Sequence, residues 1–105
     1  MSLDQAYLNP KLQGETATYQ FDFSSRLNTG VTISTQAVVA TVYSGTDASP
    51  SSIISGSATA SGSIVSQKIT AGTVGVVYQL LCTITTSDSQ TLQMAGFLAV
   101  VPPLV

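Results

Sequence analysis

The feature that most constrains this chain is a strict two-residue alternation over residues 76–86. Four side chains of that run recur at every second position on one face: Tyr78, Leu80, Cys82 and Ile84. Such a period is typical of a β-strand with one buried face. Residues 17–23 repeat the pattern, with aromatic rings at every second position. No stretch has a helical period of useful length, so the sequence predicts an all-β fold.

Turn-forming residues divide the chain into about seven short strands. The strongest candidates cover residues 17–23, 31–43, 64–69, 76–86 and 91–101. A bend or a change of sheet is expected near residues 34–36, and a weaker edge strand or hairpin over 55–63. This spacing predicts a single antiparallel, immunoglobulin-like β-sandwich over 15–101. An extended N-terminal arm (1–14) precedes it, and an apolar C-terminal tail (102–105) follows it.

Tyr78 stands at the start of the clearest strand, with apolar residues two and four positions further on. This placement resembles the tyrosine corner of immunoglobulin-like sandwiches, in which a phenol bonds to the backbone upstream and fixes the corner between the sheets. Tyr78 is therefore a candidate structural tyrosine corner. The alternative is an ordinary half-buried strand residue.

Charge is scarce in these 105 residues. The chain has 3 Lys+Arg and 5 Asp+Glu, which leaves most of the surface to Ser and Thr. Three scattered cations cannot neutralise a run of phosphates, so we expect no nucleic-acid partner.

The chain has few residues of the kinds that carry catalysis. The chain has no His, its carboxylates are spread over its whole length, and no Ser lies in a nucleophile elbow. Cys82, the single cysteine, alternates with apolar residues, which favours a buried core position. One Cys without His gives no zinc or copper site, and we expect no enzyme activity and no cofactor.

The two ends of the chain carry apolar residues outside the predicted sandwich. We see no signal peptide and no apolar run long enough to span a bilayer, so we expect synthesis in a cytoplasm and no membrane partner. Apolar side chains beyond a packed domain favour contact with other subunits. The candidate partner-docking residues are Leu3, Tyr7, Leu8, Leu12, Leu104 and Val105.

Several segments together resemble a group of small structural proteins of tailed bacteriophages. They are FDFSSRL (21–27), VTIS (31–34), YSGTDASP (43–50), GVVYQLLCTITTS (75–87) and QTL (90–92). The resemblance implies an immunoglobulin-like sandwich with a capsid- or tail-associated structural role in the virion. We expect it to act without catalysis and to bind other virion proteins and further copies of itself.

Within that group, the interpretation we favour is a capsid decoration, or cement, protein that binds the major capsid protein through its termini and sandwich faces. One alternative is a head-tail connector or tail component bound to tail subunits. Another is a module that recognises the host surface through the loops at 44–52 and 87–90.

Overall fold

The alternation expected over 76–86 is realised in β7 (Val77–Thr86), whose residues are half-buried and buried in turn along the whole strand. The computed structural model describes residues 5–7 and 10–102, with side chains from residue 10 onward. The other strands are β1 (Gln5–Tyr7), β2 (Lys11–Leu12), β3 (Ala17–Asp22), β4 (Ile33–Ser44), β5 (Ile54–Ser61), β6 (Ile64–Ile69) and β8 (Thr91–Val101). One short 3-10 helix, η1 (Pro50–Ile53), interrupts them.

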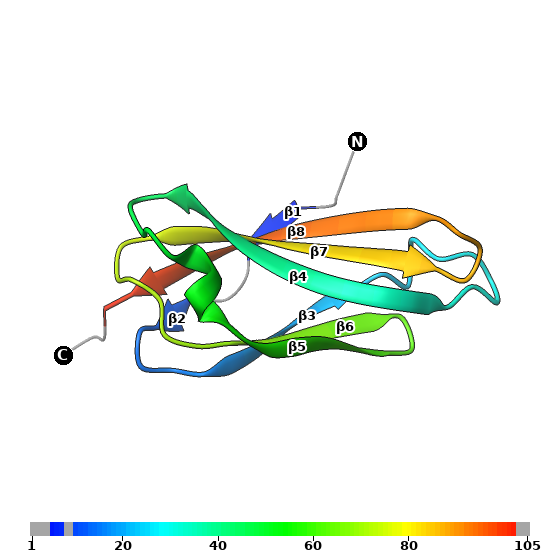
Figure 1. The fold of residues 1–105 in the computed structure, drawn as a ribbon, viewed down its shortest axis with the longest axis horizontal. Helices are drawn as coiled ribbons and strands as arrows, with labels where there is room; N and C mark the ends of the chain where they lie inside the picture. Colours follow the sequence, from blue (N-terminus) through cyan, green and yellow to red (C-terminus); the bar gives the residue numbers. More distant parts are fainter. Residues whose placement is uncertain (1–4, 8–9, 103–105) are drawn as a thin grey trace.

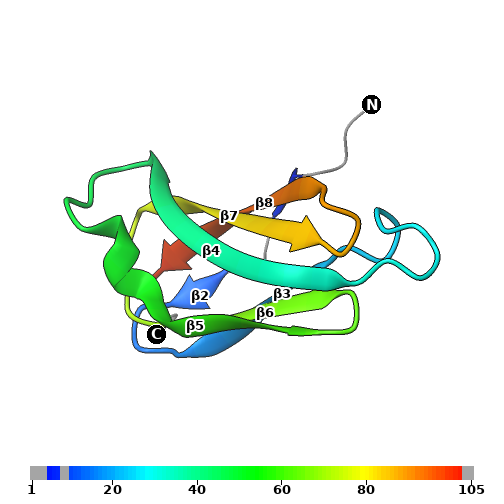
Figure 2. The ribbon, with the colours of Figure 1, turned by 45° about the vertical axis from the view of Figure 1, so that its right-hand side comes forward.

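The strands form two sheets that pack face to face (Figures 1 and 2). The large sheet has the order β1-β8-β7-β4, with β2 also on β8, and the small sheet has the order β3-β6-β5. Pairing is antiparallel everywhere except where β1 and β2 meet β8. The predictions of an all-β chain and of a β-sandwich are confirmed.

The core lies between the sheets and takes one face of each strand. β7 contributes the four side chains predicted for its buried face, and all of them are fully buried: Tyr78, Leu80, Cys82 and Ile84. The small sheet adds Phe21, Val65 and Ile69, and Phe23 follows β3. Burying each large side chain of this kind contributes roughly 1.5–3 kcal/mol, which explains why the alternation predicts the strands so well.

The long strand β4 remains in one sheet. Its pairing with β7 shifts register between Ile33 and Thr35 and again between Val42 and Ser44. Near residues 34–36 we expected either a bend or a change of sheet. The structure has an irregularity in the pairing there, and β4 does not change sheets. The next segment, 55–63, forms edge strand β5 and its hairpin to β6, with Gly62 at a φ of 61° in the turn.

A bulge interrupts the pairing of β5 with β6. Pairing with β6 jumps from Ser55–Lys68 to Thr59–Ser66, so residues 56–58 oppose Gln67 alone. The buried Gln67 amide nitrogen donates to the carbonyl oxygens of Ser55 and Gly56, both at 3.2 Å, and to that of Lys68. A bulge on an edge strand disturbs the row of backbone groups that another strand would need for pairing.

Two short strands near the N-terminus, β1 and β2, lie along the free edge of β8. Gln5–Tyr7 of β1 pairs in parallel with residues 95–97, and Lys11–Leu12 of β2 pairs with residues 100 and 101. In the described part of the expected arm, residues 5–7 and 11–12 form two strands that sequence analysis did not predict. These two strands pair through backbone hydrogen bonds, and segments of two or three residues are too short to show an alternation of polar and apolar side chains.

Candidate docking surface

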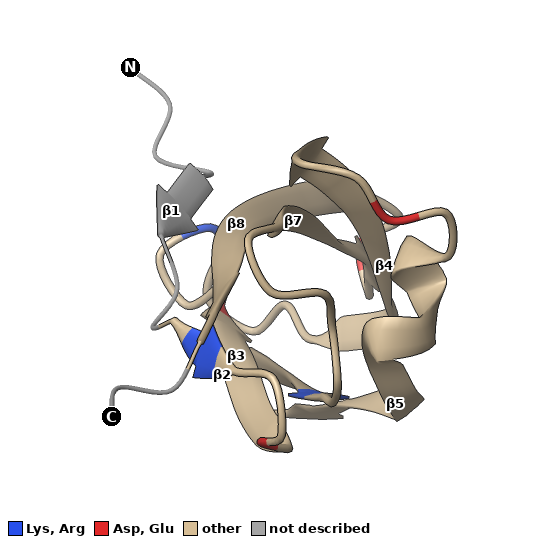
Figure 3. Cartoon of the chain, turned by 90° about the vertical axis from the view of Figure 1, so that its left-hand side faces the viewer, with Lys and Arg blue, Asp and Glu red and all other residues tan. Residues whose placement is uncertain are grey.

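Both terminal segments of the described chain reach the same end of the sandwich. Leu12 of β2 lies opposite Val101 of β8, and the 71–75 loop lies beside them. The 45–49 loop lies at the same end of the sandwich, across the 71–75 loop from β2 (Figures 1 and 3). We call this region, residues 10–14, 45–49, 71–75 and 100–102, the terminal end. Of the predicted docking residues, it contains Leu12.

A buried lysine fixes β2 at the terminal end. Lys11 is 0% exposed, and its ammonium donates to the backbone oxygens of Ala71 at 2.6 Å, Leu12 at 2.8 Å and Gln13 at 3.2 Å. Burial lowers the pKa of Lys11, and the nearby Glu15 carboxylate opposes that shift. A charge taken out of water needs such a set of acceptors, so Lys11 positions the arm against the 71–75 loop.

Tyr78 connects the two loops of the terminal end. Its hydroxyl accepts a hydrogen bond from the backbone N–H of Thr73 at 2.8 Å and donates one to Asp47 Oδ2 at 2.6 Å. The bond from Tyr78, with one from the Ser49 N–H, lowers the pKa of Asp47. Burial and the bond to Asp47 raise the pKa of Tyr78. The loops are therefore held by one buried phenol.

Glycines let the 71–75 loop approach β8. Gly72 has a φ of 102° and lies so close to Val100 that an added Cβ would sit 2.8 Å from its Cγ2. Gly75 has a φ of 88°, with open space where its Cβ would be, and its N–H donates to the carbonyl of Val100 at 2.9 Å. Between them, Val74 leaves its apolar side chain 39% exposed. The loop thus presents an apolar residue from a rigid backbone.

The predicted docking residues divide into three groups. Leu12 is half-buried in β2, where it belongs partly to the sandwich. Tyr7 lies in β1 with its backbone opposite Phe97. The remaining four lie outside the described residues: Leu3, Leu8, Leu104 and Val105.

The loops considered for host recognition lie far from each other. Ser44 pairs with Val77 at the start of β7, whereas residues 87–90 follow Thr86 at the end of the same strand. The two loops therefore lie at opposite ends of the sandwich, separated by the length of β7 (Figure 1). They form no common site, so a recognition surface built from both loops together does not exist in this fold.

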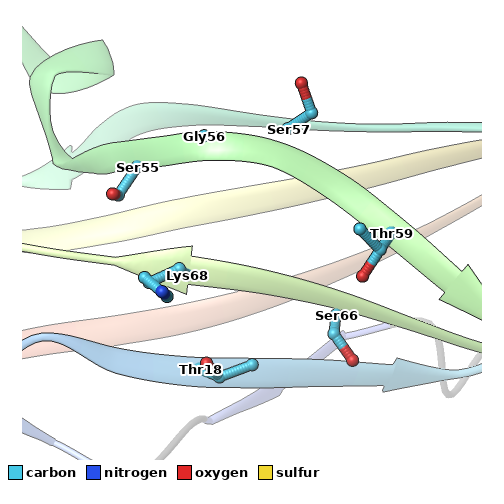
Figure 4. A pocket seen from close by; sticks show the side chains of 7 residues that line it. All are labelled: Thr18, Ser55, Gly56, Ser57, Thr59, Ser66 and Lys68. Carbon is cyan, nitrogen blue, oxygen red and sulfur yellow. The ribbon is translucent and has the colours of Figure 1, made fainter.

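A hydroxyl-lined depression of about 290 Å³ lies on the outward side of the small sheet (Figure 4). Its lining consists of Thr18, Ser55, Gly56, Ser57, Thr59, Ser66 and Lys68. These groups offer hydroxyl dipoles and one ammonium, but no carboxylate, imidazole or thiol. The depression can hydrogen-bond a polar ligand but contains no group of the kinds that usually serve as a general base near neutral pH.

Across the described residues, charged side chains are few and separated (Figure 3). No group of three or more His, Cys, Asp or Glu there could hold a metal ion. The same ranges contain no helix long and apolar enough to cross a membrane. Sequence reasoning missed Lys11, because a single lysine in a polar segment predicts a solvated charge.

Replacing Tyr78 with phenylalanine is expected to lower the free energy of unfolding by about 1–3 kcal/mol, because the two partly buried hydrogen bonds of its hydroxyl, to the Thr73 N–H and to the Asp47 carboxylate, are lost. The pKa of Asp47 should rise toward its ordinary value in the same variant. Urea titration and NMR pH titration measure the two effects. Tyr43→Phe is the control, since that ring is 62% exposed; equal losses in both variants would contradict the role given to the Tyr78 hydroxyl.

Comparison with known families places most of the chain in one of them. A sequence model of the family described as Gp77, "Podophage GP4 fiber-tail adaptor protein gp77", matches residues 11–98. The matched region begins at Lys11 in β2 and ends at Leu98 in β8, and thus contains most of the sandwich. No curated protein matches the chain.

Proposed function

The chain belongs to the Gp77 family of podophage fiber-tail adaptor proteins, and from this premise we propose that it joins a tail fiber to its neighbouring tail protein, without catalysis. Membership makes it a tail-associated structural protein of a bacteriophage virion. It supports the tail component that sequence analysis held as an alternative, in preference to the favoured interpretation of capsid decoration. The family match over residues 11–98 is the observation that carries this proposal.

We place one docking surface of the adaptor at the terminal end. An adaptor must present a preorganised surface, since rigid contacts lose less entropy on binding. Here Lys11 holds the arm, Tyr78 holds the loops, and Val74 is exposed between them. The predicted docking residues Leu104 and Val105 follow the end of β8 in the sequence.

We also propose that the sandwich is immunoglobulin-like. The orders β3-β6-β5 and β4-β7-β8 correspond to strands B-E-D and C-F-G of that fold. The bond from the Thr73 N–H to Tyr78, five residues further along the chain, supports the tyrosine-corner role of Tyr78.

The test uses purified particles of the phage that encodes the protein. Each phage preparation is grown with one variant of the gene in place of the wild-type gene. Val74→Lys, and separately the pair Leu104→Asp and Val105→Asp, should reduce its copies per particle at least tenfold by quantitative mass spectrometry. Each variant adds charge to an apolar contact, which leaves that charge buried and unpaired in the complex. Electron microscopy should show that the remaining particles lack fibers.

Ser57→Lys, on the outward side of the small sheet, is the matched control and should be incorporated normally. Incorporation of both docking variants at the wild-type level would refute docking through the terminal end. Wild-type protein found in hundreds of copies on the capsid shell would refute the tail assignment itself.

A further inference from the structure

The outward side of the large sheet departs from the pattern of the rest of the surface. Antiparallel sheets usually present polar residues to solvent and apolar ones to the core. The small sheet follows this rule, with Thr18, Gln20 and Asp22 pointing outward from β3. The large sheet instead has apolar residues directly opposite each other on β4, β7 and β8: Val39, which is exposed, Leu81, which is half-buried, and Ala95, which is buried.

An aromatic pair extends this apolar row. Tyr43 of β4 reaches across β7 to Phe97 of β8, with the ring centroids 4.5 Å apart and the planes tilted by 53°. Phe97 is nearly buried, whereas Tyr43 is 62% exposed and Val39 is 55% exposed. The exposed Tyr43 ring thus lies over the sheet and packs on the Phe97 ring beneath it.

No charged residue occupies the described outward positions of β4, β7 and β8. We define the outer face as the outward positions of β4, β7 and β8. They are Thr35, Ala37, Val39, Thr41, Tyr43, Val77, Gln79, Leu81, Thr83, Thr85, Thr91, Gln93, Ala95, Phe97, Ala99 and Val101. Exposed apolar area with tyrosine and without charge is typical of the centre of a protein interface.

We propose that the outer face is a self-association surface, on which a second copy of this chain packs its own outer face about a two-fold axis. Such an interface must be complementary to itself, because the same patch occurs on both sides. A charge-free patch meets that condition, since no like charges are brought together. A charged partner would leave its own groups buried and unpaired there. The net charge of −2 adds little long-range repulsion between copies.

Sedimentation equilibrium of the full chain, from low micromolar to millimolar concentration, measures the dimer directly. Val39→Lys and Tyr43→Lys should each raise the dissociation constant at least tenfold. Both side chains are more than half exposed, so these variants should fold as the wild type does, which circular dichroism checks. Thr18→Lys, at an exposed position of the small sheet, is the matched control and should leave the constant unchanged.

Spin labels give a second measurement that does not depend on weakening the dimer. The native Cys82 is fully buried, so a cysteine introduced at Thr41 is the accessible thiol for labelling. Thr41→Cys labels should report a short intermolecular distance, and Ser57→Cys labels should not. A wild-type protein that is monomeric at every concentration, or a dimer that both lysine variants leave intact, overturns the proposal. The inference does not rest on the proposed function.

Discussion

Between pH 9 and pH 12 the protein is expected to lose about 4 kcal/mol of unfolding free energy through Cys82 alone. Burial raises the pKa of this thiol from 9.0 to about 12. The folded state therefore keeps the proton while the unfolded chain releases it, at about 1.4 kcal/mol for each pH unit. The contribution is complete below pH 9 and disappears as the pH approaches 12.

Urea unfolding at a series of alkaline pH values, for the wild type and for Cys82→Ala, isolates this effect. The variant lacks the thiol and should lose stability less steeply. Buried Tyr78 and half-buried Tyr19, whose pKa values burial also raises, destabilise both proteins at high pH, and the lowered pKa of Lys11 acts in the opposite direction. These effects cancel in the comparison. Equal slopes for the two proteins would show that Cys82 is accessible to solvent.

The second large effect is expected from Gly72→Ala, which should lower the free energy of unfolding by about 2–4 kcal/mol. Part of this loss arises because alanine rarely adopts the φ of 102° found here. The rest arises because its Cβ would approach Val100 Cγ2 to 2.8 Å. Val100 is buried and β-branched, so it has little freedom to move away.

Gly75→Ala is the matched control for that steric contact. Gly75 has a similar φ of 88° in the same loop, but nothing lies within 4 Å of the point that an added Cβ would occupy. Its replacement should cost about 1 kcal/mol from backbone strain alone. Chemical denaturation of the two variants gives the difference. Equal losses would mean that Val100 rearranges freely and that the loop is not tightly packed on β8.

Sequence analysis predicted the strands of the sandwich because their side chains carry the information. The alternation at Tyr78, Leu80 and Cys82 follows from burial of one face, and that burial is what the structure shows. The turns were predicted equally well, since Gly62 adopts a backbone conformation that few other residues accept.

The contacts that sequence analysis missed are made by the backbone or by single polar side chains. β2 pairs with a strand at the other end of the chain, and no local pattern encodes that partner. The Lys11 ammonium donates to the carbonyl groups of Leu12 and Gln13, its neighbours in sequence, and to that of Ala71. The Ala71 acceptor lies 60 residues away and is brought to Lys11 only by the fold. Gln67 likewise fills a bulge that appears only when β5 and β6 are paired.

The parallel pairing of β1 and β2 with β8 has a mechanical consequence. The arm and β8 run in the same direction, so the chain enters this pair of segments at one end and leaves it at the other. Tension between Gln5 and Val101 would pull the arm and β8 past each other along their length. The pairing bonds would then share the load in shear, instead of opening one after another as in a peeled hairpin. In the proposed role of joining two tail proteins, the chain would carry tension between its neighbours in this shear arrangement.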